Sequence, residues 1–296
     1  SFVSIFSNKL NTIASNTNSY LKSFFLKQKS NSYLLQPMKY GVFSGGKRFR
    51  SAIVVNTGRI FNIDYKKLII IGSAIECIHS YSLIHDDLPS MDNDELRRGK
   101  LSVHKKFNEF TAILAGNSLL TLAFEILSGN NLQLSQNYKN ELIKTLSMCA
   151  GHSGLAGGQY SDLTFENKSI LKKNIINMQK KKTGELFGFC CESIAIIKGV
   201  KSIKRKKLKE IGINIGLLFQ IVDDLIDYKG DSMIVGKPTR SDEKKGKATL
   251  VNLLGYEETI NFAKNLKKKI DQQIKKYGNK ANDLLDSVEF ILKRKF

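Results

Sequence analysis

The sequence predicts an all-α fold, organised as a single domain of about ten helices over residues 1–296. Three observations support this class. Apolar residues recur at helical spacing over most of the chain, and the alternation of polar and apolar residues that is typical of strands is scarce. Proline, which breaks helices, occurs only at Pro37, Pro89 and Pro238. A hydrophobic fraction of 42% is ample for a packed core.

Two of the expected helices, residues 66–85 and 208–228, are apolar on most faces, which is typical of helices at the centre of a core. The run Ile69–Ile71 is β-branched, but it lies inside a longer helical pattern and is assigned to the helix. The remaining helices are amphipathic and span residues 9–28, 34–58, 108–127, 137–155, 169–198, 256–276 and 281–295. Breaks are expected at residues 41–46, 89–101, 128–131, 230–247 and 278.

The chain is strongly basic, with 47 Lys and Arg against 27 Asp and Glu and a formal charge of +20. Such a charge is typical of nucleic-acid binding, of attraction to anionic membranes, or of lysines on solvated faces. The lysines are scattered and no nucleic-acid-binding module is recognisable, so we expect no nucleic-acid partner. The charge would also attract an anionic substrate.

The cysteines indicate a reducing compartment. Cys77, Cys149, Cys190 and Cys191 lie in apolar segments without a CxxC pair, which is typical of buried thiols in a cytosolic protein. Residues 1–7 lack the charged start and long apolar core of a signal peptide. No uninterrupted apolar run approaches the roughly 18 residues of a membrane span. We therefore expect a cytoplasmic protein without stable membrane insertion.

Two aspartate-rich clusters carry most of the functional signal, and each ends one of the two apolar helical segments. The first contains Asp86, Asp87 and Asp92, and the second contains Asp223, Asp224 and Asp227. Carboxylates brought together repel one another unless a cation joins them. Oxygen-only ligands suit Mg2+, which binds few carboxylates together with waters and substrate phosphates. A lone cluster would be interpreted as a solvated helix end, whereas two clusters on buried helices indicate a magnesium-bridged phosphate site.

The two clusters are expected to differ in geometry. Asp227 is three and four residues from Asp224 and Asp223, so these carboxylates share a helix face. In the first cluster Pro89 breaks the helix, and a kink or loop must bring Asp92 back toward Asp86.

Basic side chains near the clusters are candidates for phosphate binding. The adjacent guanidinium groups of Arg97 and Arg98 match a diphosphate. Lys47 and Arg50 are expected on one side of a helix start, after two glycines that let backbone amides approach an anion. His79 lies seven residues before the first cluster; a lone histidine on an apolar helix is usually structural, and only its neighbours suggest a phosphate. Near the second cluster the candidates are Lys182, Thr183, Gln220, Lys237 and Lys247, each lysine being indistinguishable by itself from a surface lysine.

Several motifs occur in a recognisable order along the chain. They are GGKRFR at 45–50, ECIHSYSLIHDDLPSMD at 76–92, LRRGKLSVHKKF at 96–107, AILAGNSLLTLAFEIL at 112–127, GGQYSDL at 157–163, KKTGELF at 181–187, FQIVDDLID at 219–227 and GKPTRSDEKKGKATLVNLLG at 236–255. Over about residues 41–255 the chain thereby resembles the trans-isoprenyl diphosphate synthases, specifically those of the bacterial farnesyl diphosphate synthase type.

The resemblance implies the isoprenoid synthase fold, with helices around a central cavity, and a head-to-tail prenyl transfer. Isopentenyl diphosphate would be condensed with dimethylallyl and geranyl diphosphate to farnesyl diphosphate through ionisation, condensation and proton elimination. Three Mg2+ per active site would assist, bound by Asp86, Asp87, Asp92, Asp223 and Asp227. A homodimer is also implied.

The resemblance assigns the other candidates residue by residue. Lys47, Arg50, His79 and Arg98 match residues that hold isopentenyl diphosphate. Arg97, Lys182, Thr183, Gln220, Lys237 and Lys247 match those around the allylic diphosphate. The expected catalytic set is Asp86, Asp87, Asp92, Arg97, Lys182, Asp223 and Lys237. Tyr81 and Ser82 precede the first cluster, where a bulky side chain would limit the growing tail to fifteen carbons.

Alternatives remain open at this level. A geranyl or geranylgeranyl diphosphate synthase would share these motifs. A class I terpene cyclase would not need the isopentenyl diphosphate residues, and a non-catalytic subunit would be expected to have lost one cluster. The chain departs from the family at Asn93, often Asp, and at Lys247–Val251, which lacks a common proline. Residues 293–295 resemble a basic tail that closes over the site in bacterial members, with a solvated tail as an equal alternative.

Overall fold

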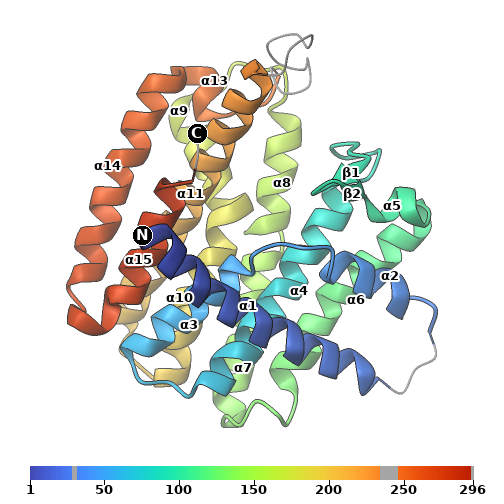
Figure 1. The fold of residues 1–296 in the computed structure, drawn as a ribbon, viewed down its shortest axis with the longest axis vertical. Helices are drawn as coiled ribbons and strands as arrows, with labels where there is room; N and C mark the ends of the chain where they lie inside the picture. The colour runs from blue at the N-terminus through green and yellow to red at the C-terminus, as the bar shows by residue number, and fades with distance from the viewer. Residues whose placement is uncertain (29–31, 234–245, 295–296) are drawn as a thin grey trace. The chain divides into compact units, whose positions relative to one another are not determined.

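The all-α class is confirmed. The computed structural model describes residues 1–28, 32–233 and 246–294, with the backbone alone for 231–233. Almost all regular structure in these residues is helical (Figure 1). The only strands in the described ranges are β1 (Leu96–Arg97) and β2 (Lys100–Leu101). The chain divides into two compact units, which are described separately below.

Unit 2 comprises residues 7–58 and 62–143 and contains the first aspartate cluster. Its central helix, α4 (Tyr65–Asp86), is buried on most faces and runs beside α6 (Glu109–Ser128) (Figure 1). The side chain of Asn108 caps α6 by accepting a hydrogen bond from the backbone N–H of Thr111 at 2.9 Å. The other elements are most of α1 (Phe2–Leu26) and α3 (Phe49–Ile60), all of α2 (Leu35–Val42), β1, β2 and α5 (Val103–Lys106), and the start of α7 (Gln136–Ala150).

Unit 1 comprises residues 1–6, 59–61 and 144–296 and contains the second cluster. Its core is the pair α10 (Glu185–Lys198) and α11 (Ser202–Met233). The two helices can pack closely because Gly212 has no side chain: a Cβ there would lie 2.4 Å from the Phe187 carbonyl oxygen. Around them lie α8 (Leu155–Thr164), α9 (Lys172–Gln179), the π-helix η1 (Lys180–Gly184), α13 (Leu250–Leu254), α14 (Tyr256–Lys275), the 3-10 helix η2 (Gly278–Ala281) and α15 (Asn282–Leu292).

The long predicted helices exist, with three differences. The expected helix at 169–198 consists of α9, η1 and α10, and the short α8 was not predicted. The expectation that the second cluster ends its helix is wrong, because α11 continues to Met233. No proline follows Asp227 until Pro238, and Gly230 alone does not stop the helix.

Two helices among the described residues, α4 and α6, are long and apolar enough to cross a membrane by length and composition alone. In the most apolar 18-residue stretch of α4, 72% of the residues are buried, as expected for a core helix. In the corresponding stretch of α6, 44% are buried. The exposed part of α6 includes Phe110, Ile113 and Leu114. This helix therefore presents an apolar face that its own unit does not cover.

All four cysteines fall within the described ranges, and all are buried without a disulfide, as predicted. Burial raises the pKa of the Cys77 thiol to about 12, so it stays protonated at neutral pH. These thiols act as small apolar core residues.

Candidate functional site

The first aspartate cluster is shaped by a loop that folds back on the end of α4. The backbone N–H of Asp92 donates to the carbonyl oxygen of Asp86 at 2.8 Å, and that of Asn93 donates to Leu88 at 3.0 Å. Asn93 has a φ of 55°, a conformation that asparagine tolerates better than most residues. The predicted return of Asp92 toward Asp86 is confirmed, and Asn93 is the residue that makes the turn.

Asp87 is buried and paired with Arg97. The guanidinium donates from Nε to Oδ2 at 3.0 Å and from Nη2 to Oδ1 at 2.5 Å, a two-bond geometry that fixes both side chains. Burial alone would lower the pKa of Arg97, but the hydrogen bond and charge of Asp87 raise it above its ordinary value. Asp87 and Arg97, which were predicted to bind metal and diphosphate respectively, are thus partners of each other.

Arg97 and Arg98 belong to a small hairpin that sends them to different partners. Leu96 pairs with Leu101 and Arg97 with Lys100, so Arg98 and Gly99 form the two-residue turn. Both have positive φ, 51° and 77°, as this type of hairpin turn requires. Arg98 donates to the carbonyl oxygen of Gly45 at 3.3 Å. The two guanidinium groups thus contact different partners, although their adjacency in the sequence had suggested that both face one diphosphate.

The glycine pair before α3 makes room for Arg98. A Cβ at Gly46 would lie 3.0 Å from Arg98 Nη2, and φ there is 100°. The expectation that Lys47 and Arg50 share one side of a helix start is wrong, because α3 begins at Phe49 and Arg48 has a φ of 55°. Lys47 lies exposed in the loop, whereas Arg50 is buried in the first turn.

His79 is placed among arginines. Burial is the largest influence on its imidazole, and Arg50, Arg98, Arg97 and Arg48 add to it, holding the pKa of His79 well below its usual range. The side chain keeps some solvent exposure. A neutral imidazole can donate one hydrogen bond to a phosphate without adding charge to an already cationic cluster.

The two predicted chain-length residues precede the first cluster on α4. Tyr81 meets His85 edge to face, with ring centroids 5.1 Å apart, and burial together with Asp86 raises the pKa of its hydroxyl. Ser82 is buried and donates to the carbonyl oxygen of His79 at 2.6 Å. Of the two residues, Tyr81 has the bulkier side chain near Asp86. The hydroxyl of Ser82 is already hydrogen-bonded to the backbone of its own helix.

In the second cluster, Asp223 is neutralised by an arginine just beyond α15. Arg294 Nη1 donates to Asp223 Oδ1 at 2.7 Å and Nη2 donates to the Phe219 carbonyl oxygen at 3.1 Å. Its guanidinium also lies 4.1 Å from the centre of the Phe219 ring. The basic C-terminal segment thus contacts the cluster directly through Arg294.

Asp224 ends a chain of amide hydrogen bonds. It accepts from Gln179 at 2.9 Å and from Gln220 at 3.0 Å, while the oxygen of Gln220 accepts from the Thr183 hydroxyl at 2.9 Å. Burial, only partly opposed by Gln220, and the neighbouring Asp223 and Asp227 raise the pKa of Asp224 to about 7. The predicted residues Thr183 and Gln220 act here by positioning this carboxyl.

Two of the three lysines predicted in this unit, Lys182 and Lys247, converge on Asp162 of α8, which is buried. Lys182 Nζ lies 2.5 Å from its Oδ2, and Lys247 Nζ lies 3.7 Å from the same atom. Lys247 also pairs with Glu166 at 2.6 Å. The π-helix η1 carries Lys182. Helix α8 can approach η1 because Gly158 has no side chain: a Cβ there would lie 2.2 Å from the backbone nitrogen of Lys182. Lys237 lies outside the described residues.

The carboxylates fit a Mg2+ ion by their chemistry. Asp86 and Asp92 are partly exposed and joined through their backbones, and Asp223 and Asp227 lie one turn apart on α11. Within the described ranges, no three or more His, Cys, Asp or Glu side chains are gathered as a metal-binding group. An open arrangement suits Mg2+, which keeps several waters and takes its remaining ligands from phosphates.

Three residues that contact the predicted site residues were not assigned from the sequence. Asp162, Glu166 and Gln179 each act through a partner that is distant in the chain. Asp162 lies in the GGQYSDL motif, which marked the segment without indicating what its carboxylate contacts.

The chain is similar to known proteins over most of its length. The chain matches the family model for polyprenyl synthetase over residues 31–288. It is 38% identical over 255 residues to the farnesyl diphosphate synthase of Escherichia coli, covering 86% of this chain and 85% of that protein. Among solved structures, an FPP/GFPP synthase from Zymomonas mobilis matches with a TM-score of 0.84 and 38% identity, over 97% of this chain and 99% of the other. A geranyltransferase from Helicobacter pylori, complexed with magnesium and isoprenyl diphosphate, matches with a TM-score of 0.78 and 32% identity, over 96% of each chain.

The helical fold and the aspartate clusters define the class of isoprenoid-synthesising transferases. Within that class, the chain belongs to the polyprenyl synthetase family.

The raised pKa of Asp224 predicts a stability that depends on pH. Its proton is held more tightly in the folded chain than at the ordinary pKa of 3.8, so its contribution is favourable at low pH and is lost as pH rises toward 7. The asparagine in Asp224→Asn cannot ionise. The amide of Gln179 can rotate so that its oxygen accepts a hydrogen bond from the asparagine amide. In EDTA at pH 8 the variant should be more stable by about 1 to 2 kcal/mol, with a smaller gain at pH 5.

Urea unfolding at the two pH values measures this difference. Glu258→Gln removes an exposed carboxylate on α14 and should show no such trend. A variant at Asp224 that is less stable than the wild type at pH 8 would contradict the assignment.

Proposed function

We propose that the chain is a farnesyl diphosphate synthase, which condenses isopentenyl diphosphate with dimethylallyl and then geranyl diphosphate. The observation that carries this proposal is the presence of both aspartate clusters together with two sets of cations that could each bind a phosphate. One set surrounds His79, and the other converges on Asp162. Relatives that are 37–42% identical are named farnesyl diphosphate synthases. The whole chain, residues 1–296, is proposed to act as one catalytic domain.

The set around His79 suits isopentenyl diphosphate. Arg98 and Lys47 are exposed cations, and Arg50 lies in the first turn of α3. The neutral imidazole of His79 adds a hydrogen-bond donor. This set would hold the diphosphate while the double bond of the substrate remains available for attack.

The set in unit 1 suits the allylic diphosphate. Asp162 holds Lys182 and Lys247 near each other, so that two ammonium groups can face the departing phosphate oxygens. Lys237 and Arg97 are proposed to add charge, and Thr183 and Gln220 to keep Asp224 in place.

Mg2+, proposed at three ions per site on Asp86, Asp87, Asp92, Asp223 and Asp227, would supply Lewis-acid stabilisation of the charge on the leaving diphosphate. The lysines stabilise the same charge, and apolar side chains such as Phe219 exclude water from the carbocation. The released diphosphate is the proposed acceptor of the proton that ends each condensation.

A homodimer is proposed through the apolar face of α6. Phe110, Ile113 and Leu114 are 67%, 43% and 46% exposed, and exposed apolar patches commonly mark protein interfaces. Sedimentation should give twice the 33.3 kDa chain mass, and Ile113→Asp should lower it toward one chain. A wild-type mass of one chain would contradict the proposal.

The cytoplasm is the proposed compartment, because four buried thiols without a disulfide suit a reducing environment. Neither nucleic acid nor stable membrane insertion is part of the proposal.

The purified protein should form farnesyl diphosphate from isopentenyl diphosphate and either dimethylallyl or geranyl diphosphate in the presence of Mg2+. EDTA should abolish the reaction, and Asp223→Asn should reduce it by about a hundredfold or more, since the lost interaction acts on charge that develops in the transition state. Product analysis by chromatography measures both effects. Absence of elongation from either allylic substrate would overturn the proposed function.

A longer product is the alternative, since the Zymomonas mobilis structure is described as that of an FPP/GFPP synthase. Tyr81 is the residue proposed to limit the tail. Tyr81→Ala should shift products beyond fifteen carbons, because it removes the ring that meets His85 below Asp86. Tyr81→Phe keeps the ring and should keep the product. Dephosphorylated products can be sized by chromatography, and an unchanged length in the alanine variant would remove Tyr81 from this role.

A further inference from the structure

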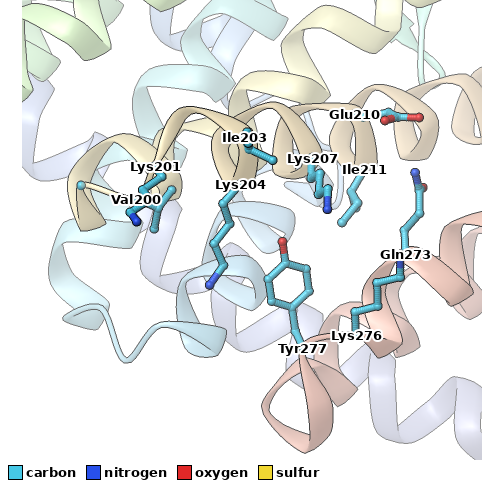
Figure 2. Close-up of a pocket in the computed structure, with 11 residues that line it drawn as sticks. Val200, Lys201, Ile203, Lys204, Lys207, Glu210, Ile211, Gln273, Lys276 and Tyr277 are labelled. Carbon is cyan, nitrogen blue, oxygen red and sulfur yellow. The ribbon is translucent and has the colours of Figure 1, made fainter.

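A large pocket in unit 1 lies far along α11 from the second aspartate cluster. Its volume is about 830 Å3, which is within the range of small-molecule sites. It is formed by the beginning of α11 and the end of α14, as Figure 2 shows. The lining residue nearest to the cluster in sequence is Ile211. Asp223 lies twelve positions further along α11, about 18 Å along the helix axis. The pocket is therefore separate from the carboxylates of the second cluster.

The pocket is lined by lysines that form no ion pair with a carboxylate in the described part of the chain. Lys201, just before α11, and Lys204 and Lys207 on α11 recur at every third residue, and Lys276, just after α14, adds a fourth ammonium (Figure 2). The single acidic residue, Glu210, lies 3.9 Å from Lys269. The lining therefore favours an anion.

Aromatic rings hold one of these lysines in place. Lys204 Nζ lies 5.4 Å from the centre of the Phe61 ring and 5.8 Å from that of Tyr277. The two rings meet edge to face with centroids 5.9 Å apart. A cation fixed against rings loses less freedom when it binds an anion than a freely moving surface lysine would.

The rest of the lining is aliphatic. Val200, Ile203 and Ile211 lie among the lysines, and Ile203 is 73% exposed. Ile211 is already buried, but an inorganic anion would leave Ile203 and the half-buried Val200 in water, whereas a ligand with an aliphatic chain would cover them. A nucleotide base fits less well, because Phe61 and Lys204 already contact Tyr277 and the amide oxygen of Gln273 already accepts from Asn214 at 3.2 Å.

We propose that this pocket is a second ligand site, which binds a linear aliphatic phosphate or diphosphate without Mg2+. The lysines bind the phosphate oxygens, and Val200, Ile203 and Ile211 contact the chain. The natural ligand rests on the proposed function, since a prenyl diphosphate product has this chemistry. Binding itself depends only on the pocket.

Calorimetry with farnesyl diphosphate, kept below its micelle concentration in EDTA, tests the proposal on the full chain. The wild type should bind one molecule, and Lys204→Gln/Lys207→Gln should weaken binding at least tenfold. Lys206→Gln/Lys268→Gln removes equal charge from exposed positions outside the lining and should leave the affinity unchanged. Inorganic diphosphate and farnesol, which are the head and the tail alone, should each bind at least tenfold more weakly.

The outcomes separate the two proposals. Asp223→Asn/Asp227→Asn should retain EDTA binding while losing condensation with Mg2+; binding without condensation in the wild type would refute the proposed function and support the pocket. The proposed second ligand site would be overturned if the wild type bound no farnesyl diphosphate in EDTA. It would also be overturned if both double-lysine variants lost the same affinity. Binding to phosphatidylglycerol vesicles but not to monomeric farnesyl diphosphate would also overturn it, in favour of a membrane surface.

Discussion

Repulsion between neighbouring carboxylates is the constraint on which the arrangement of each aspartate cluster depends. In each unit a guanidinium group pairs with one carboxylate of the cluster and so reduces the repulsion. Arg97 forms two hydrogen bonds with Asp87, and Arg294 reaches Asp223 from beyond α15. Asp224 is treated differently: two glutamines donate to it, and burial raises its pKa to about 7. The carboxylates are therefore held in defined positions by two means, guanidinium pairing and amide hydrogen bonds. In the first cluster Asp87 is buried beside partly exposed Asp86 and Asp92, whereas in the second Asp223 and Asp224 are half-buried and Asp227 is exposed.

The same principle organises the cations. Arginines around His79 lower its pKa, so the cluster gains a neutral donor instead of a further charge. In unit 1 a buried carboxylate, Asp162, holds two lysines that would otherwise repel each other. Each set can receive an anion without first reorganising its own charges, which is the condition for strong electrostatic stabilisation of a leaving diphosphate. The division into two sets matches a reaction between two diphosphates.

Much of this was predictable from local sequence, because its causes are local. Pro89 forced the chain to turn, and Asp92 does return to Asp86. Contacts between distant segments were not predictable. The GGQYSDL motif marked Asp162 without showing that Lys182 and Lys247 meet there. The Arg98–Gly99 turn separates two adjacent arginines that sequence alone suggested would act together, and the positive φ of Arg48 delays the helix that Lys47 was expected to begin.

The central claim is that both aspartate clusters serve Mg2+-dependent binding of one allylic diphosphate. Calorimetry with dimethylallyl thiodiphosphate, an unreactive analogue, measures the Mg2+-dependent component as the difference between Mg2+ and EDTA. We expect Asp86→Asn/Asp92→Asn and Asp223→Asn/Asp227→Asn each to weaken that component by about tenfold or more, since each pair removes charge-assisted ligands. If one of the two double variants kept the wild-type Mg2+-dependent affinity, the account would be contradicted, because the other cluster would then bind the diphosphate alone.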